Sequence, residues 1–367
     1  MHIEKIELHN FRNYSNLELE FSKNVNLILG KNAQGKTNLL EAVYLTAIGR
    51  SFRTSKDIDL VKFNENNSII KVWAEKELNS TTVEISIKRK GEKSSEKYIK
   101  KDKKNVTRTS QLLKNILIVI FSPEDLKIVK DEPEKRRKFI DRELSQISPK
   151  YYNSLSNYKK SLLQRNTYLK EENLEPSIID IWDVQLPKYG AEVIFLREKF
   201  IEKLSEYSSK IHSGITGGKE KLDILYEPNV EIKQSLSEQE DFIYSELKNS
   251  FKTDSKNRNT SVGPHRDDIL FVVNDIDMRN FGSQGQQRTC ALSLKLAELN
   301  LIKEKTDEDA ILLLDDVMSE LDADRQEFLI DTMKNNQLFI TTTELDQNIK
   351  DKFKDLKIFY IENGNLI

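Results

Sequence analysis

The feature that most restricts the fold is a glycine-rich segment near the amino terminus, Gly30–Thr37, with the sequence GKNAQGKT. It matches the pattern G-x-x-x-x-G-K-[ST] in full. The apolar run Val25–Leu29 before it has strand character, and Thr37–Ile48 after it has the apolar spacing of a helix. A strand, a glycine-rich loop and a helix in this order predict an α/β core with a phosphate-binding loop.

The residue types of this loop indicate its chemistry. Glycines let the backbone wrap so that successive N–H groups face a phosphate at the positive end of the following helix. Lys36 then adds a positive charge at the β and γ phosphates of ATP, and Thr37 adds a hydroxyl ligand for Mg²⁺. The residues expected to bind the nucleotide here are Gly30, Lys31, Asn32, Ala33, Gln34, Gly35, Lys36 and Thr37. The alternative is a chance glycine turn before a helix, which the flanking elements disfavour.

A short apolar run that ends in two acids, Ile311–Asp316, has the form of a Walker B strand. Such a strand places a carboxylate at the edge of a sheet beside the nucleotide, so Asp315 is expected to hold Mg²⁺ and Asp316 to polarise the attacking water. The expected catalytic residues are therefore Asp316, Lys36 and Asp315. The alternative is a strand that simply meets solvent, and the complete phosphate-binding loop makes it the weaker interpretation.

A second glycine-and-serine turn, Phe281–Arg288, opens a helix that continues through Leu299. A helix N-terminus with small residues can bind an anion, and one nucleotide does not need two such sites in one chain. The turn resembles the signature loop of ABC ATPases, which reaches the γ phosphate bound to the other protomer. Ser283, Gly285 and Gln286 are therefore expected to complete a nucleotide site in a homodimer. Ser319–Asp322 resembles the D-loop that crosses the dimer seam, and it also fits a serine N-cap before an acidic turn.

The order of elements predicts two lobes. Strands are expected on both sides of the glycine-rich loop, in a hairpin around Gly91 and again near the carboxyl terminus, whereas the pattern from Pro133 to about Ile211 is helical and strongly charged. The predicted fold is an α/β ABC-type ATPase head: lobe I, a mixed sheet with helices, comprises residues 1–125 and 300–367, and lobe II, a mainly helical insertion, comprises 126–299. Three prolines are expected to cut the helical region into segments and to exclude a long coiled coil: Pro149, Pro176 and Pro187.

Beyond the ATPase motifs, the sequence resembles the RecF family in four further stretches. These are Asn10–Tyr14 (NFRNY), Gly49–Thr54 (GRSFRT), Phe121–Leu126 (FSPEDL) and Gly263–Asp268 (GPHRDD). The resemblance implies a cytoplasmic bacterial protein that acts in recombinational repair of gaps and stalled forks, works with RecO and RecR to help RecA load, and influences the SOS response. It also implies a head shared with SMC proteins, with Arg12 near the nucleotide phosphates.

Two departures from the general ABC pattern bear on the rate of hydrolysis. Asp316 stands where many ABC ATPases have a glutamate, and Thr341–Thr343 fill the region that usually carries a switch histidine. Both are normal for the family that the chain resembles. A shorter base without that histidine predicts slow hydrolysis, and therefore a timing switch rather than a fast motor.

Net charge gives no sign of a polyanionic partner, because 58 basic and 60 acidic residues leave a formal charge of -2. A DNA surface must therefore be a local patch. The basic stretch between Lys88 and Arg108 is one candidate, with Lys88, Arg89, Lys100, Lys101, Lys103 and Lys104 as the expected DNA contacts. Arg50 and Arg53 form a smaller second candidate. A solvated charged hairpin explains the longer stretch equally well.

Other features narrow the class of protein. With one cysteine, Cys290, and four histidines, neither an internal disulfide nor zinc chemistry is expected. His265 and Arg266 are expected to organise the second lobe or its dimer face rather than to catalyse. The longest apolar run, Ile116–Phe121, is too short to cross a bilayer, so a cytoplasmic protein is expected. The rival interpretations are a transporter nucleotide-binding subunit, another ABC- or SMC-type DNA clamp, and a scaffold that uses ATP only to hold a dimer together.

Overall fold

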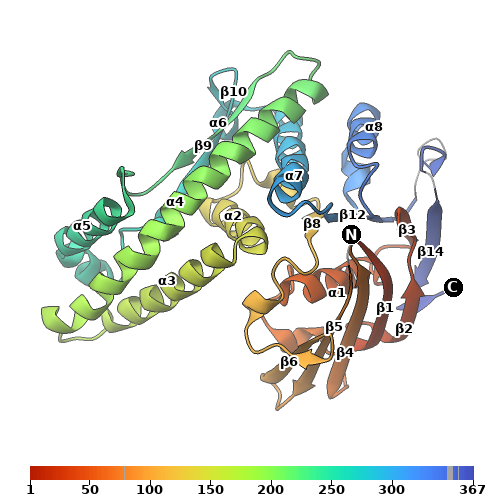
Figure 1. The fold of residues 1–367 in the computed structure, drawn as a ribbon, viewed down its shortest axis with the longest axis horizontal. Helices are drawn as coiled ribbons and strands as arrows, with labels where there is room; N and C mark the ends of the chain where they lie inside the picture. Colours follow the sequence, from red (N-terminus) through yellow and green to blue (C-terminus); the bar gives the residue numbers. More distant parts are fainter. Residues whose placement is uncertain (78, 345–349, 354) are drawn as a thin grey trace. The chain divides into compact units, whose positions relative to one another are not determined.

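The computed structural model describes residues 1–77, 79–344, 350–353 and 355–367 (Figure 1). The chain divides into two compact units. Unit 1 comprises Met1–Asp125 and Glu298–Ile367, and unit 2 comprises Leu126–Ala297. Each unit has a hydrophobic core of its own.

The first sheet of unit 1 is antiparallel and has the strand order β2-β1-β4-β5-β6-β7. Its strands are β1 (His2–Phe11), β2 (Tyr14–Glu20), β4 (Asn67–Glu75), β5 (Ser80–Arg89), β6 (Ser95–Lys101) and β7 (Lys104–Asn105). Residues alternate between the two faces, so that Val83, Ile85 and Ile87 of β5 are buried while the residues between them are more exposed. The predicted hairpin around Gly91 is confirmed by the β5–β6 pair.

The second sheet of unit 1 has the order β15-β14-β3-β13-β12-β8. The strands from β14 to β8 run parallel, and β15 pairs antiparallel to β14. Their bounds are β3 (Val25–Leu29), β8 (Ile118–Phe121), β12 (Ile311–Asp315), β13 (Leu338–Thr342), β14 (Leu356–Glu362) and β15 (Asn365–Leu366). Strands β3, β8, β12 and β13 are buried along their whole length, as expected for a parallel sheet covered on both faces.

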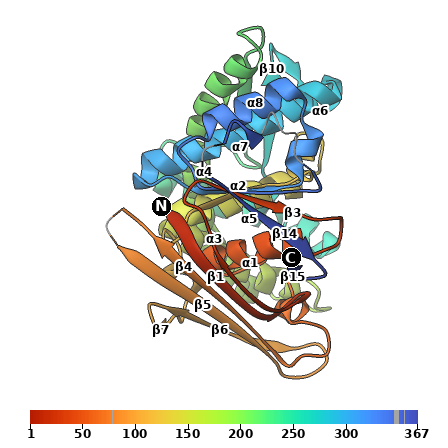
Figure 2. The same ribbon diagram turned by 90° about the vertical axis from the view of Figure 1, so that its right-hand side faces the viewer.

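Helix α1 (Lys36–Ile48) lies between the two sheets of unit 1, as Figure 2 shows. Side chains of α1 and of both sheets form one continuous core. Ten of the helix's residues are buried, so the helix has no solvent-exposed face along most of its length. This packing fixes the start of α1 at the carboxyl end of β3, with the loop Gly30–Gly35 between them. Helix α8 (Ala323–Thr332) follows β12 in the same unit.

Unit 2 is mainly helical, with a small antiparallel sheet in the order β11-β10-β9. The helices are α2 (Pro133–Ile147), α3 (Pro149–Tyr168), α4 (Pro176–Ile215), α5 (Leu236–Asn257), α6 (Met278–Phe281) and α7 (Gln284–Thr306), and the unit boundary at Glu298 falls within α7. The strands are β9 (Leu222–Glu227), β10 (Asp268–Val273) and β11 (Ile276–Asp277). Cys290 is free and buried.

The prolines of unit 2 act in two different ways. Pro149 and Pro176 each occupy the first turn of a helix, where the missing N–H leaves no bond unmade. The prediction that Pro187 also ends a helix is wrong, because α4 continues through it for 40 residues in all. Helix α4 packs against α3, α5 and β9, and this packing outweighs the roughly 3 kcal/mol cost of an internal proline. No long coiled coil occurs among the described helices.

Candidate nucleotide site

The loop after β3 takes a conformation that depends on glycine. Gly35, the N-cap of α1, has a φ of 118°, and an added Cβ atom would lie 2.6 Å from the Asn13 amide nitrogen. Two residues where β1 meets β2 hold the loop by hydrogen bonds. The Asn13 side-chain amide donates to the Gln34 carbonyl oxygen at 2.9 Å, and the Tyr14 hydroxyl donates to the Gly35 carbonyl oxygen at 2.9 Å. The stretch NFRNY therefore supports the loop directly.

Lys36 is nearly buried, and its ammonium group is held by the loop itself. The Nζ atom donates to the Gly30 carbonyl oxygen at 2.7 Å and to that of Lys31 at 3.2 Å. Its nearest carboxylate is that of Asp316, at 4.0 Å. An ammonium group bonded to neutral carbonyl oxygens can exchange them for phosphate oxygens, which form stronger charge-assisted hydrogen bonds.

The two acids predicted at the end of β12 lie beside this loop. The Thr37 hydroxyl donates to Asp315 Oδ1 at 2.8 Å, so the two predicted Mg²⁺ ligands are brought together. Asp316 follows in a left-handed conformation with φ 52°. Burial raises the pKa of the Asp316 carboxyl above its ordinary value, and the Asp315 charge adds to this, whereas Lys36 acts in the opposite direction. Hard oxygen donors at this spacing fit Mg²⁺.

Thr341, at the end of the neighbouring strand β13, is a site residue whose contacts the sequence did not reveal. It is fully buried, and its hydroxyl donates to Asp315 Oδ1 at 2.8 Å. The backbone N–H of Asp316 donates to the same hydroxyl at 3.0 Å and to the Thr341 carbonyl oxygen at 3.1 Å. The only feature of the sequence that could have suggested a role for Thr341 in the site is its position at the carboxyl end of a parallel strand.

The Arg12 guanidinium is paired with a buried carboxylate. Its guanidinium donates to both oxygens of Glu41, from Nε and Nη2, at 2.8 Å each, and to the Asp59 carbonyl oxygen at 2.8 Å. Glu41 is fully buried in α1 and also accepts from the Ser51 hydroxyl at 2.5 Å. Arg53 donates to the Asn38 side-chain oxygen at 2.7 Å and lies 3.5 Å from Glu41. Glu41 thus joins Arg12 to the segment after α1.

The predicted signature turn is a well-defined helix start in unit 2. The Ser283 hydroxyl accepts from the Gln286 backbone N–H at 3.2 Å, and the Gln286 side-chain oxygen accepts from the Ser283 N–H at 3.1 Å, which is a reciprocal cap. The Gln286 amide also donates to Glu220 at 2.9 Å. Ser283 and Gly285 are exposed at this end of α7.

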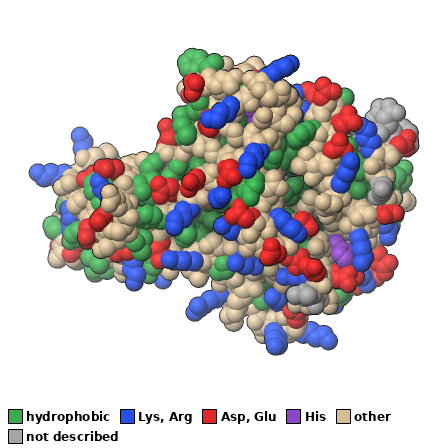
Figure 3. Space-filling view, turned by 45° about the horizontal axis from the view of Figure 1, so that its top comes forward, with side chains coloured by type: hydrophobic (Ala, Val, Ile, Leu, Met, Phe, Trp, Pro, Cys, Tyr) green, Lys and Arg blue, Asp and Glu red, His purple; other side chains and the backbone are tan. Residues whose placement is uncertain are grey.

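The predicted DNA-contact residues divide by position. Lys88 and Lys100 lie on the exposed face of the antiparallel sheet, and Lys103 and Lys104 lie at the β6–β7 turn. Lys100 is paired with Glu84 at 3.1 Å. Exposed charges of both signs are mixed over the face shown in Figure 3, in agreement with the balanced net charge.

Arg50 is exposed, in the loop that also holds Arg53. Arg89 is only partly exposed, and its Nε atom is buried without a hydrogen-bond partner. Lys101 lies across from the buried Val83, at the edge of the core face.

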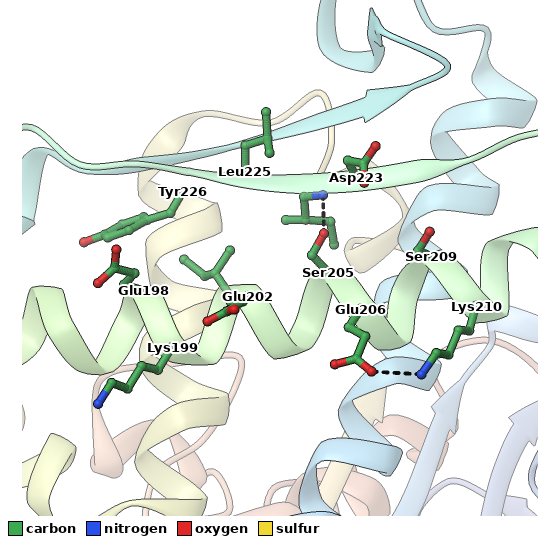
Figure 4. A pocket seen from close by; sticks show the side chains of 12 residues that line it. Glu198, Lys199, Glu202, Ser205, Glu206, Ser209, Lys210, Asp223, Leu225 and Tyr226 are labelled. Carbon is green, nitrogen blue, oxygen red and sulfur yellow. Dashed lines mark hydrogen bonds and ion pairs between the residues drawn. The ribbon is translucent and has the colours of Figure 1, made fainter. Parts of the chain in front are cut away.

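The structure has two surface hollows of interest, one in each unit. A hollow of about 400 Å³ lies beside the glycine-rich loop and is lined by Leu29, Gly30, Lys31, Thr343, Glu344, Lys350 and Tyr360. A groove of about 910 Å³ lies between α4 and β9 in unit 2 (Figure 4). In this groove the Ser205 hydroxyl accepts from the Ile224 backbone N–H at 2.8 Å, so α4 covers the free edge of β9. The groove contains none of the residues predicted to bind nucleotide or DNA.

Gly263–Asp268 lies partly in the interior of unit 2, with Pro264 and Asp267 buried and Arg266 exposed. His265 accepts from the Tyr158 hydroxyl through Nδ1 at 2.7 Å, because its Nε2 lies 2.9 Å from the Thr260 carbonyl oxygen and must carry the proton there. Asp267 accepts from Arg197 at 2.8 Å. These contacts support the expectation that this stretch organises the second lobe.

Comparisons with known proteins agree over nearly the whole chain. The family described as RecF/RecN/SMC N terminal domain matches residues 2–365. A DNA replication and repair protein RecF of Clostridium tetani is 44% identical over all of both chains, and one of Clostridioides difficile is 42% identical over all of this chain and 98% of its own.

Solved structures give the same result. One described as the recombination mediator protein RecF-ATPrS in the RecFOR pathway is 38% identical, with a TM-score of 0.91 over 100% of this chain and 97% of that one. The corresponding RecF-ATP structure has a TM-score of 0.89 over the same shares and is also 38% identical. An SMC head at 16% identity and a TM-score of 0.56 shares the fold.

No helix in the described part of the chain is both long enough and apolar enough to span a membrane. The predicted fold class is confirmed as that of an SMC- and ABC-type ATPase head. With this fold and these relatives, the chain belongs to the RecF family of DNA replication and repair proteins, which are ABC-type ATPases.

Proposed function

We propose that the protein is a slow, Mg²⁺-dependent ATPase that closes as a homodimer on DNA and acts as a timing switch in recombinational repair. The observation that carries the proposal is the meeting of Lys36, Thr37 and the two acids Asp315 and Asp316 at the carboxyl ends of β3 and β12. Two acids and a lysine of this arrangement suit phosphoryl chemistry, in which positioning and charge stabilisation supply most of the catalysis.

Within the site, the backbone N–H groups of Gly30–Thr37 and the Lys36 ammonium bind the phosphates. Thr37 and Asp315 hold Mg²⁺, which when bound neutralises charge on the phosphate oxygens. Asp316 orients the water molecule and accepts its proton. Its raised pKa, caused first by burial, suits a carboxylate that must accept a proton near neutral pH. Arg12 binds α1 directly, through the carboxylate of Glu41, and so helps to orient the helix whose N-terminus faces the phosphates.

The dimer supplies the other half of the site. Ser283, Gly285 and Gln286 of one protomer meet the γ phosphate held by the other, because an exposed helix N-terminus with small residues is a favourable site for an anion. ATP therefore links the two protomers, and its hydrolysis releases them. The aspartate base and the absence of a histidine at Thr341–Thr343 favour slow turnover.

The names of the relatives support a pathway for the protein. Proteins of this family are named for DNA replication and repair, and solved ones are assigned to the RecFOR pathway. We infer that this protein acts in the cytoplasm at gaps and stalled forks, with RecO and RecR, to promote RecA loading and SOS induction. A DNA scaffold that uses ATP without hydrolysing it is the second candidate, favoured by the acid being an aspartate rather than a glutamate.

Asp316→Asn separates these two functions. In a switch the variant binds ATP but cannot release the dimer, so sedimentation should show a dimer that persists for the whole run, and hydrolysis should fall by two orders of magnitude or more, roughly the loss for one catalytic group. The wild-type protein should return to monomer as ATP is consumed. A variant that dimerises and dissociates as the wild type does would support the scaffold.

The DNA surface is tested by charge reversal at Lys100, Lys101, Lys103 and Lys104. Because each phosphate contact releases counterions, the slope of log affinity against log salt should lose up to about 0.9 for each contact removed. The matched control carries four Lys→Glu changes at exposed positions of unit 2: Lys160, Lys170, Lys188 and Lys252. If both variants lose affinity for duplex DNA equally, net charge explains the loss and the hairpin is not the site.

A further inference from the structure

The hydroxyl of Thr341 stands between the two acids at the end of β12. It donates to Asp315 Oδ1 at 2.8 Å and accepts from the Asp316 backbone N–H at 3.0 Å. The residue is fully buried. A hydroxyl has one proton to donate and two lone pairs to accept with, so one group serves both acids at once. Valine, which has the same shape, can do neither.

Asp315 gains a fixed orientation from this contact. Its Oδ1 atom accepts from the hydroxyls of Thr341 and Thr37, each at 2.8 Å. The two donors come from different elements, β13 and α1, and together they fix the orientation of the Asp315 carboxylate. Partners that orient a metal ligand in this way affect metal affinity although they do not touch the metal.

Asp316 gains a fixed backbone. A non-glycine residue in the left-handed region is less stable by about 1–2 kcal/mol than in the right-handed region, so it must be held there. The anchor is the Asp316 N–H, which donates to the Thr341 hydroxyl at 3.0 Å and to the Thr341 carbonyl oxygen at 3.1 Å. The Thr341 hydroxyl therefore supplies one of the two acceptors that hold the Asp316 backbone, and the main-chain carbonyl oxygen supplies the other.

We propose that Thr341 is a positioning residue that sets both acids together: Asp315 for Mg²⁺ binding and Asp316 for its role as the base. The inference rests on the proposed ATPase function and adds that the two acids are coupled through one side chain of the adjacent strand. It places this role in the stretch Thr341–Thr343, where other ABC ATPases carry a switch histidine. The hydroxyl, rather than the size of the side chain, is what the role requires.

The test compares Thr341→Val, Thr341→Ser and the control Thr46→Val in the full-length protein. Thr46 is equally buried in α1, and its hydroxyl donates to the Val43 carbonyl oxygen at 2.7 Å, within the helix. ATP binding is measured by calorimetry in EDTA and across a Mg²⁺ titration, and hydrolysis is measured at saturating ATP. Thermal unfolding of each variant reports whether it is folded.

Thr341→Val should bind ATP in EDTA as the wild type does, but lose about 10–100-fold in apparent Mg²⁺ affinity and in kcat, the usual effect of removing a group that orients a metal ligand. Thr341→Ser should restore most of both, and Thr46→Val should change neither. Wild-type Mg²⁺ affinity and kcat in Thr341→Val would overturn the proposal. So would an equal loss of ATP binding in EDTA, because that outcome means a purely structural role.

The proposed function is judged separately, from the wild-type protein alone. If the wild type binds Mg²⁺ and ATP together but hydrolyses nothing, the ATPase function fails, and the Mg²⁺ titration of Thr341→Val still decides the orientation of Asp315.

Discussion

The buried arginines of unit 2 and the buried Lys36 of unit 1 differ in their partners. In unit 2 the buried arginines Arg136, Arg165 and Arg197 each have a carboxylate partner within 2.8 Å. Arg197 also donates to the Tyr151 hydroxyl at 2.9 Å and to the Pro264 carbonyl oxygen at 2.6 Å. In unit 1 the buried Lys36 has only carbonyl oxygens, and its nearest carboxylate is 4.0 Å away.

This difference separates a structural cluster from a site. The buried Arg197 guanidinium is matched by carboxylates, a hydroxyl and a carbonyl oxygen, and removing it leaves several groups unpaired. An ammonium held by weak acceptors can take a stronger one. Both regions stand out in the sequence as motifs, Gly263–Asp268 in unit 2 and Gly30–Thr37 in unit 1, and the second is the one that holds a buried cation with carbonyl oxygens as its hydrogen-bond acceptors.

The largest expected effect on stability is at Arg197. Replacing it with methionine leaves Asp141 and Asp267 without their buried partner, and breaking a buried ion pair costs about 3–5 kcal/mol. Urea unfolding should show this loss in the transition of unit 2. Lys199→Met changes an exposed neighbour on the same helix and should have little effect. A stability loss below about 1 kcal/mol for Arg197→Met would mean that the network is not what holds unit 2 together.

Lys36→Met should show the opposite pattern. Its loss of stability should be much smaller, because only two hydrogen bonds to carbonyl oxygens disappear. Hydrolysis should fall by about 10²–10³-fold, the typical loss of one group that stabilises transition-state charge. Lys56→Met, an exposed lysine in the same unit, serves as the control in steady-state assays. A Lys36→Met protein that is as destabilised as Arg197→Met would remove the distinction between the two units.

Local patterns predicted much of unit 1. The strand Val25–Leu29 and the acids after Ile311–Leu314 were identified because short runs of apolar residues mark buried parallel strands. Thr37 and Asp315 were both expected to hold Mg²⁺, and the structure places the Thr37 hydroxyl 2.8 Å from Asp315 Oδ1. Strand β4, in the centre of the antiparallel sheet, is not among the predicted strands, because two apolar residues on its outer face, the exposed Ile69 and the partly exposed Trp73, disturb its alternation.

Contacts between elements distant in sequence could not be predicted. The role of Thr341 requires knowing that β13 is next to β12, which a single sequence does not reveal. The bidentate contact of Arg12 with Glu41 is of the same kind, because it joins residues 29 positions apart. Pro187 is expected to end a helix from local propensity alone. In the structure, tertiary packing keeps α4 continuous through this residue.

The smallest expected effect tests His265, a partly buried histidine of unit 2. Burial lowers the pKa of His265 to about 4, whereas an unfolded chain has a value of 6.5. Between these values the unfolded state takes up a proton that the folded state refuses, so stability falls as the pH falls below 6.5. The loss should reach about 2 kcal/mol at pH 5, since each unit corresponds to about 1.4 kcal/mol.

His265→Gln keeps a donor for the Thr260 carbonyl oxygen and an acceptor for the Tyr158 hydroxyl, but it does not titrate. Its unfolding free energy should therefore fall less between pH 7 and pH 5 than that of the wild type. His9→Gln, at an exposed position in unit 1, should leave the wild-type dependence unchanged. Parallel curves for His265→Gln and the wild type would mean that the proton is taken up elsewhere. The expected difference comes from one contact: a second proton on the imidazole removes the acceptor of the Tyr158 hydroxyl at Nδ1, and the glutamine side chain takes up no such proton.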